Sequence, residues 1–271
     1  MAVVTISRQL GSLGTEITSA LAARLGLKVV DKDSIEATLV SMGMPEARVE
    51  QYDERKPGFW QLFSAEKDRY LHFVKTAVYR AAAKDCVIVG RGGQALFQGI
   101  PGVLKVRIIA SPAVRVKRIM TEYSVNEDRA RQMMHRNDTE RAGYHRFFFN
   151  VAWEADHLYD VIVNTDLLGR QESVEILAKA AESSSLASRV PDLRRRLADL
   201  SIVQEVITAI IYEQRIPTLF LEVTSEDGRV TITGAVQVAS SVQRCVEVAR
   251  SVTGVKAVEN RIEVVSYYLG V

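Results

Sequence analysis

The sequence predicts an α/β fold, a parallel sheet flanked by helices, together with a small second domain. Two observations favour the sheet: short apolar runs alternate with helical patterns through the first two-thirds of the chain, and these runs have the composition of strands buried on both faces. A third observation separates the second domain, because strand-like segments beyond residue 183 alternate apolar and polar residues. We therefore expect helices on both faces of the sheet and a C-terminal α-β-β-α-β unit.

The chain opens with a strand, a loop and a helix. Residues 3–6 form a short apolar run that predicts a strand, and residues 11–15 form a loop of mostly small residues. A helix is expected over residues 15–25, because apolar side chains recur there on one face before a glycine. A second short strand, residues 27–30, ends at Asp31.

The rest of the first domain repeats this alternation. Residues 33–83 are expected to be mostly helical, with breaks at Pro45 and at residues 56–58, and a charged helical stretch is expected over residues 125–158. Further buried strands are predicted at residues 86–89, 103–110 and 160–164.

The second domain begins after a serine run. We expect a first domain at residues 1–182, a linker at 183–198 and a second domain at 199–271. In the tail, period-two runs flank Glu226-Asp227-Gly228, which is a strong hairpin turn signal. A helix over residues 238–252 and a strand over residues 259–265 complete the unit.

Composition excludes several classes of protein. The 271 residues carry a formal net charge of only +2, which does not indicate a nucleic-acid partner. Two cysteines are too few for a disulfide framework or a zinc site. No apolar run approaches the ~18 residues of a membrane helix, and no basic segment precedes an apolar core at the start. We expect a cytoplasmic protein without a transmembrane segment.

The loop after the first strand has the geometry of a phosphate site. A strand, a glycine-rich loop and a helix bring backbone N–H groups and a helix N-terminus to bear on an anion. However, residues 7–15 do not match G-x-x-x-x-G-K-[ST], and they contain no lysine. Taken alone, this stretch is interpreted most simply as a tight strand-to-helix turn.

Further motifs follow this loop in a defined order along the chain. The opening ISRQLGSLG, residues 6–14, resembles the start of the divergent cytidylate kinase-like family, which begins I-S-R-x-x-G-S-G-G. Four later segments resemble the acceptor-side, lid-leading, lid and closing-strand segments of that family, in the same order. They are VIVGRG at 87–92, ASPAVRVKR at 110–118, RNDTER at 136–141 and YDVIVNT at 159–165. The resemblance covers about residues 1–180 and implies a P-loop nucleoside monophosphate kinase fold.

The resemblance implies a donor site for ATP. Gly11, Ser12, Gly14 and Thr15 would wrap the donor phosphates, and Thr15 would touch Mg²⁺. ATP and Mg²⁺ are therefore the expected cofactors.

The resemblance also implies an acceptor site and a lid. Asp31 and Arg91 would hold a nucleoside monophosphate, and Arg136 and Arg141 would close over the transferring phosphoryl group, with Asp138 orienting Arg141. From the residues alone, the lid arginines are equally explained as a solvated face or as ion-pair members, and Asp31 as a helix N-cap.

Two departures from the family pattern bear on activity. Leu13 stands where the family has a glycine, and a side chain there obstructs close approach of a triphosphate. The usual lysine position is Gly14. Arg8 is the natural substitute cation, because a guanidinium binds phosphate through two points.

The tail resembles a BON domain. The matching segments are DGRVTITGAV, residues 227–236, and GVKAVENRIEV, residues 254–264. The resemblance implies an interaction module, with a homodimer contact and a protein or lipid ligand as open alternatives. A compact appendage that helps to pair subunits is the plainer interpretation.

These observations lead to one function and two alternatives. The first is a kinase, a transferase that moves a phosphoryl group from ATP to a CMP-like nucleoside monophosphate. The runner-up is a catalytically degraded nucleotide-binding sensor that signals through the tail, which Leu13 and the missing lysine favour. A kinase with another small-molecule acceptor is the third interpretation.

Overall fold

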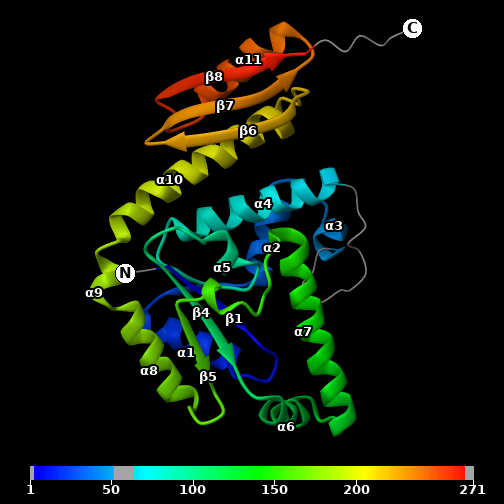
Figure 1. Cartoon of the computed structure of the whole chain (residues 1–271), viewed down its shortest axis with the longest axis vertical. Helices are drawn as coiled ribbons and strands as arrows, with labels where there is room; N and C mark the ends of the chain where they lie inside the picture. The colour runs from blue at the N-terminus through cyan, green and yellow to red at the C-terminus, as the bar shows by residue number, and fades with distance from the viewer. Residues whose placement is uncertain (1–2, 52–63, 266–271) are drawn as a thin grey trace. The chain divides into compact units, whose positions relative to one another are not determined.

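The computed structural model describes residues 3–51 and 64–265 (Figure 1). The chain divides into two compact units, Met1–Leu193 and Arg194–Val271. The break predicted at residues 56–58 lies outside the described part of the chain. Among the described residues, none of the helices combines the length and the apolar composition that a bilayer crossing requires.

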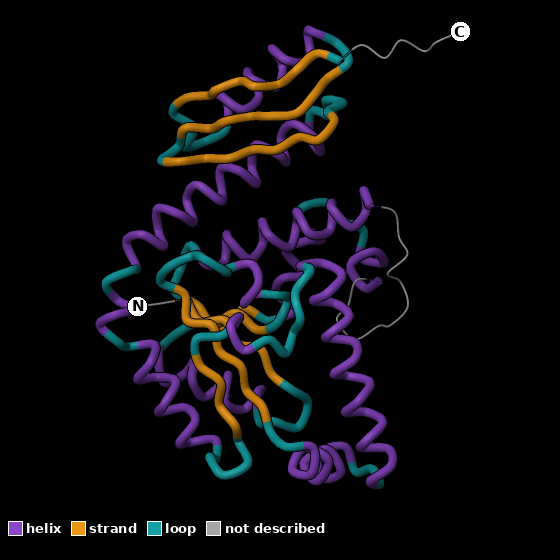
Figure 2. Tube along the Cα trace, in the orientation of Figure 1, coloured by secondary structure: helices purple, strands orange, loops and turns teal. Residues whose placement is uncertain are grey.

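The first unit is built on one five-stranded sheet, drawn in orange at its centre in Figure 2. Its spatial order is β2-β3-β1-β4-β5, and every neighbouring pair is parallel. This confirms the predicted parallel sheet. The strands are β1 (Val3–Arg8), β2 (Lys28–Val30), β3 (Cys86–Val89), β4 (Val103–Ile109) and β5 (Val161–Asn164).

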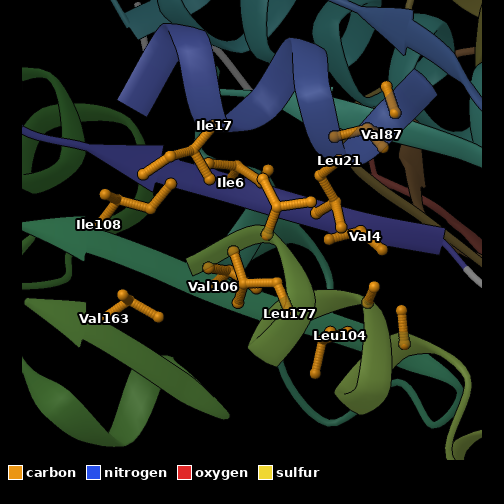
Figure 3. Packing of buried hydrophobic residues seen from close by; sticks show 14 of the residues in the cluster. Val4, Ile6, Ile17, Leu21, Val87, Leu104, Val106, Ile108, Val163 and Leu177 are labelled. Carbon is orange, nitrogen blue, oxygen red and sulfur yellow. The ribbon is translucent and has the colours of Figure 1, made fainter. Parts of the chain in front are cut away.

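Helices cover both faces of this sheet, as the alternation of patterns predicts. On one face α1 (Gly14–Leu25) and α8 (Arg170–Ala181) pack Ile17, Leu21 and Leu177 against the strands (Figure 3). On the other face α5 (Gly93–Leu96) lies against Thr5 of β1. The remaining helices are α2 (Lys32–Ser41), α3 (Glu46–Gln51), α4 (Ser64–Ala82), α6 (Pro112–Tyr123), α7 (Glu127–Phe149), the 3₁₀ turn η1 (Asp156–Leu158) and α9 (Ser184–Ala187).

Parallel strands end at one edge of the sheet, and that edge gathers the residues singled out in the sequence. β1 leads into the glycine loop, β2 ends at Asp31, and β3 leads through Gly90 into Arg91. β4 and β5 end beside them at Ile109 and Asn164, which are paired in register. In open parallel sheets this carboxyl edge is where ligands bind.

The second unit has the predicted α-β-β-α-β order. Its sheet runs β6-β7-β8, with an antiparallel and then a parallel pair. Val206, Ile232 and Cys245 lie in its core. The elements are α10 (Val190–Ile207) with a π turn, η2 (Thr208–Glu213), then β6 (Leu219–Glu226), β7 (Arg229–Val236), α11 (Ala239–Ser251) and β8 (Ala257–Val264).

Asp199 of α10 holds the hairpin turn of the second unit. Its buried carboxylate accepts hydrogen bonds from the Ser225 hydroxyl at 2.6 Å and from the N–H groups of Asp227 and Gly228, each at 2.9 Å. Burial alone raises the pKa of Asp199, but these hydrogen bonds outweigh burial and hold the pKa below its ordinary value of 3.8.

We expect Asp199→Ala to destabilise the second unit by about 2–3 kcal/mol, because three donors lose their acceptor. Since the folded pKa is lowered, the contribution of Asp199 is present above pH 3.8 and is lost as the pH falls through the folded pKa. Hydrogen exchange of the β6 and β7 amides measures both effects. Glu222→Ala, on the exposed surface of β6, is the matched control and is expected to stay within about 0.5 kcal/mol; equal effects of the two variants would contradict this role of Asp199.

Candidate functional site

The loop between β1 and α1 is a tight turn closed by its own residues. The buried Ser12 donates its hydroxyl to the Gln9 carbonyl at 2.8 Å. Gly11 has a φ of 75°, and a Cβ there would lie 2.8 Å from the carbonyl oxygen of Arg115. Ser12 therefore shapes the loop from within, and Gly11 lets the loop lie directly on α6.

The N-terminus of α1 carries no side-chain cap. Leu13 occupies the N-cap position with a left-handed backbone, φ 60°, and its side chain packs against the core. The first helical hydrogen bond runs from the Ile17 N–H to the Leu13 carbonyl. Among the described residues, the N–H groups of Gly14, Thr15 and Glu16 have no acceptor. These N–H groups and the exposed Thr15 are therefore available to an anionic ligand.

A cavity of about 420 Å³ opens between this loop and α6. The loop residues Gly11, Gly14 and Thr15 line it, as the sequence predicts for a phosphate loop. Its cationic lining comes from three elements, namely Arg8 of β1, Lys117 and Arg118 of α6, and Arg141 of α7.

Two arginines of α6, whose roles the sequence analysis missed, tie that helix to the loop. The buried Arg115 donates from Nε to the Leu10 carbonyl at 2.8 Å. Arg118 donates to the Gly11 carbonyl at 3.3 Å and to the hydroxyl and carbonyl oxygens of Thr165 at 2.8 and 2.7 Å. The run RVKR, residues 115–118, was the available signal, but it does not show which carbonyls the guanidinium groups reach.

Asp138 contacts a partner other than the predicted one. Its two carboxylate oxygens accept hydrogen bonds from both terminal nitrogens of Arg115, each at 2.8 Å. The expectation that Asp138 orients Arg141 is therefore wrong. The physical reason is packing, because α6 brings both terminal nitrogens of the buried Arg115 onto the two Asp138 oxygens, whereas Arg141, which is also buried, donates to the Arg8 carbonyl.

The two predicted lid arginines behave differently. Arg141 is buried, donates to the backbone carbonyl of Arg8 and lies over the Trp153 ring at 5.8 Å. It thereby joins α7 to the end of β1 and lines the cavity. Arg136 is 68% exposed, pairs with Glu140 at 2.7 Å and is not among the cavity-lining residues. The structure therefore brings Arg141, and not Arg136, to the loop.

Asp31 caps α2 at the end of β2 and is not among the residues that line the cavity. Its carboxylate accepts from the Ser34 N–H at 3.0 Å, while the Ser34 hydroxyl accepts from the Asp31 N–H, which completes a capping box. The Ser34 N–H holds the pKa of Asp31 below its ordinary value; burial opposes this shift, and the Ser34 hydroxyl and the positive charge of Arg8 reinforce it.

Arg91 is buried beneath the acceptor side. It is 1% exposed, with a left-handed φ of 51°, between the left-handed Gly90 and Gly92. Its guanidinium donates to the Tyr70 hydroxyl at 3.1 Å and to the Glu36 carboxylate. Arg91 therefore stands at the predicted edge of the sheet, with its charge paired by Glu36.

The residues present suit ATP and a magnesium ion held through phosphate oxygens. No group of three or more His, Cys, Asp or Glu side chains that could hold a metal lies within the described ranges. The exposed hydroxyl of Thr15, beside N–H groups without an acceptor in the described structure, is an oxygen donor of the kind that Mg²⁺ accepts, and it would hold the ion together with phosphate oxygens.

We expect Leu13→Gly to raise ATP affinity several-fold while the stability changes by no more than about 1 kcal/mol. Glycine relieves the strain of the left-handed backbone, about 1–2 kcal/mol, but it also removes a half-buried side chain whose burial stabilises the fold by a similar amount. It also clears the cavity wall beside Thr15. Calorimetric titration with ATP and thermal unfolding measure the two effects. Leu13→Ala keeps the strain and truncates the side chain, so equal affinity gains in both variants would attribute the effect to space alone.

Known proteins resemble this chain in the first unit above all. The model of the cytidylate kinase-like family matches residues 3–167, more than half of the chain, and the model of the BON domain matches residues 198–266. A cytidylate kinase from Archaeoglobus fulgidus is 28% identical over 181 residues, which cover 66% of this chain and 94% of that protein.

One solved structure shares the fold of the first unit, and a second is more distantly similar. An uncharacterized protein from Eubacterium ventriosum superposes with a TM-score of 0.53 at 20% identity, covering 68% of this chain and 99% of its own. A shikimate kinase from Bacteroides thetaiotaomicron gives a TM-score of 0.42 at 14% identity, covering 67% and 99%. The family model spans the parallel sheet and the glycine loop at its carboxyl edge. The chain therefore belongs to the cytidylate kinase-like family, and its tail carries a BON domain.

Proposed function

We propose that this protein is an ATP-dependent phosphotransferase whose acceptor is a CMP-like nucleoside monophosphate. The observation that carries the proposal is the capless N-terminus of α1, whose N–H groups of Gly14, Thr15 and Glu16 have no acceptor in the described structure and adjoin a cavity with cationic lining. Membership of a kinase-like family supports phosphoryl transfer in general. The acceptor rests on the resemblance to cytidylate kinases.

The donor side would work by positioning and charge. The loop N–H groups would hold the phosphates, Thr15 would hold Mg²⁺, and the ion would neutralise phosphate charge. Arg8 and Arg141 add positive charge where the β1 strand ends. In the reaction the bond from the γ-phosphorus to its bridging oxygen breaks, a bond to an acceptor oxygen forms, and ADP leaves. Charge neutralisation in a preorganised site is the main source of rate in such transfers.

The acceptor side would use Asp31 and Arg91 at the ends of β2 and β3. Asp31 keeps its charge because its pKa is lowered, so its carboxylate is able to accept from an amino or hydroxyl group of the acceptor. Arg91 is fixed by Glu36 and Tyr70, so a phosphate monoester would have to share its guanidinium with Glu36. This pairing supports a second candidate, a kinase whose small acceptor lacks a phosphate.

The third candidate, a nucleotide sensor without turnover, is favoured by Leu13, which lines the cavity where the family pattern has a glycine. Under that candidate the BON domain would transmit the bound state to a partner. A homodimer contact, a protein or lipid ligand of that domain and a cytoplasmic location stay predictions.

Supplying ATP, Mg²⁺ and a panel of nucleoside monophosphates, nucleosides and small hydroxylated metabolites, and measuring ADP, tests all three. Turnover with CMP supports the proposal, and turnover with a phosphate-free acceptor alone supports the second candidate. ATP binding without any turnover supports the sensor. Absence of ATP binding would overturn all of them.

The variant Asp31→Asn separates the two roles of Asp31. Asparagine is as good an N-cap as aspartate, so thermal unfolding is expected to change by less than about 0.5 kcal/mol. If Asp31 contacts the acceptor, kcat/KM for that acceptor should fall at least tenfold, because a charge-assisted hydrogen bond is lost. Asp33→Asn, two residues further along in the first turn of α2 and exposed, is the control. Unchanged kcat/KM in Asp31→Asn would show that Asp31 caps α2 and does not contact the acceptor.

A further inference from the structure

The loop of this protein has no room for a lysine at the usual position. A Cβ on Gly14 would lie 2.4 Å from the Cβ of Arg8 and 2.6 Å from its Cγ. These are distances that real Cβ atoms do not reach, and both atoms are close to the β1 backbone, where they have little freedom to move. The missing lysine is thus a consequence of how Arg8 runs beneath the loop. A cation for the phosphates has to come from another element.

Two of the four cationic residues that line the cavity already bind other groups of the protein. Arg118 binds Thr165 and the Gly11 carbonyl with its terminal nitrogens. Arg141 is buried, donates to the Arg8 carbonyl and lies over Trp153. Moving either guanidinium onto a ligand would break these contacts. Arg8, in turn, interacts with the Asp31 carboxylate.

Lys117 differs from these arginines. It lines the cavity and is exposed, and within the described structure its ammonium makes no ion pair or hydrogen bond. Helix α6 is held against the loop by the two arginines that flank Lys117 in the sequence. Arg115 donates a hydrogen bond to the Leu10 carbonyl, and Arg118 donates one to the Gly11 carbonyl. A flexible lysine stem on a fixed base allows the charge to follow a moving phosphoryl group.

We propose that Lys117 supplies from α6 the ammonium that the phosphate loop lacks, and that it binds the non-bridging phosphate oxygens of the donor nucleotide. This inference rests on the proposed function. A lysine on an exposed helix face is commonly only solvated. Here the cavity lining, the steric exclusion of a lysine at position 14 and the tethered helix together select Lys117 as the phosphate ligand.

The test compares Lys117→Met, which keeps most of the apolar stem, with Lys117→Arg, which keeps the charge. Calorimetry measures binding of ATP, tripolyphosphate and adenosine to the full chain. Lys117→Met should weaken ATP and tripolyphosphate about tenfold or more, as expected for a lost hydrogen bond to a charged group, and leave adenosine unchanged. Lys117→Arg should restore most of the loss. The unfolding temperature without nucleotide should not move, because the exposed Lys117 ammonium has no hydrogen bond or ion pair to lose within the described structure.

Lys179→Met on α8, another exposed lysine without a partner in the described residues, controls for net charge and should leave all three affinities unchanged. If the wild-type chain binds ATP and Lys117→Met binds it equally well, or if ATP and adenosine weaken together, the assignment of Lys117 is overturned while the proposed function stands. If the wild-type chain binds neither ATP nor tripolyphosphate, both are overturned.

Discussion

Gly92→Ala is expected to destabilise the first unit by about 2–5 kcal/mol. Gly92 has a φ of 69°, and a Cβ there would lie 2.1 and 2.3 Å from two ring carbons of Phe149 at the end of α7. The left-handed backbone contributes about 1–2 kcal/mol and the overpacking about 1–3 kcal/mol. The half-buried ring packs on Tyr144, His145 and Phe148 of the same helix, so it moves only at the expense of these contacts. Hydrogen exchange of the β3 amides, or urea unfolding, measures the loss.

Gly99→Ala isolates the backbone part of this effect. Gly99 has a similar φ of 73°, but nothing lies within 4 Å of a Cβ added there. It should therefore cost only about 1 kcal/mol. Adding Phe149→Leu to Gly92→Ala should recover at least about 1 kcal/mol relative to the sum of the single variants, because the two residues share one contact. Equal losses in Gly92→Ala and Gly99→Ala would show that the ring moves away freely.

The same contact bears on function, because Gly92 follows Arg91. Phe149 packs on the turn that places Arg91, and Arg91 reaches Tyr70, which in turn packs on Phe148 at 4.9 Å. The C-terminal end of α7 and the turn that carries Arg91 are therefore packed together through these residues. A shift at Phe149 should misplace the Arg91 turn before it unfolds the sheet.

The strands and the loop were predictable because their signals are local. Apolar runs gave the strands within one or two residues, and glycines marked the backbone turns. Asp31 satisfied two interpretations at once, since it caps α2 and also stands at the carboxyl edge of the sheet. A local sequence pattern predicts the conformation of the residues that form it, and this was sufficient to place the strands, the turns and the cap of α2.

The partners of the lid arginines were not predictable, because they depend on how α6 and α7 pack. Arg136 and Arg141 are five residues apart on one continuous helix, which turns their side chains about 140° apart at 3.6 residues per turn. Both therefore cannot face one cavity. Asp138 is three residues from Arg141 and on the same side, which made that pairing plausible from spacing. Arg115, 23 residues earlier in the chain, took the carboxylate instead.

Asp138→Ala is expected to cost about 3–5 kcal/mol, because it leaves the enclosed guanidinium of Arg115 without its carboxylate. The loss should extend to the phosphate loop, since Arg115 also holds the Leu10 carbonyl. Urea unfolding measures the stability, and ATP titration measures the loop. If Asp138 instead served Arg141 in the reaction, kcat would fall while the unfolding free energy stayed within about 1 kcal/mol.

Two further variants make this distinction sharp. Glu127→Ala removes an exposed carboxylate that pairs with Arg131 on the same helix, and it should cost no more than about 1 kcal/mol. Arg115→Met combined with Asp138→Ala removes both charges, so it should recover part of the loss of Asp138→Ala, because no unpaired charge stays buried. ATP affinity should not recover in that double variant, since the bond from Arg115 to Leu10 is gone. Stability and nucleotide binding would thus separate in one variant, which is the behaviour expected of a buried arginine that holds the phosphate loop and does not itself contact the nucleotide.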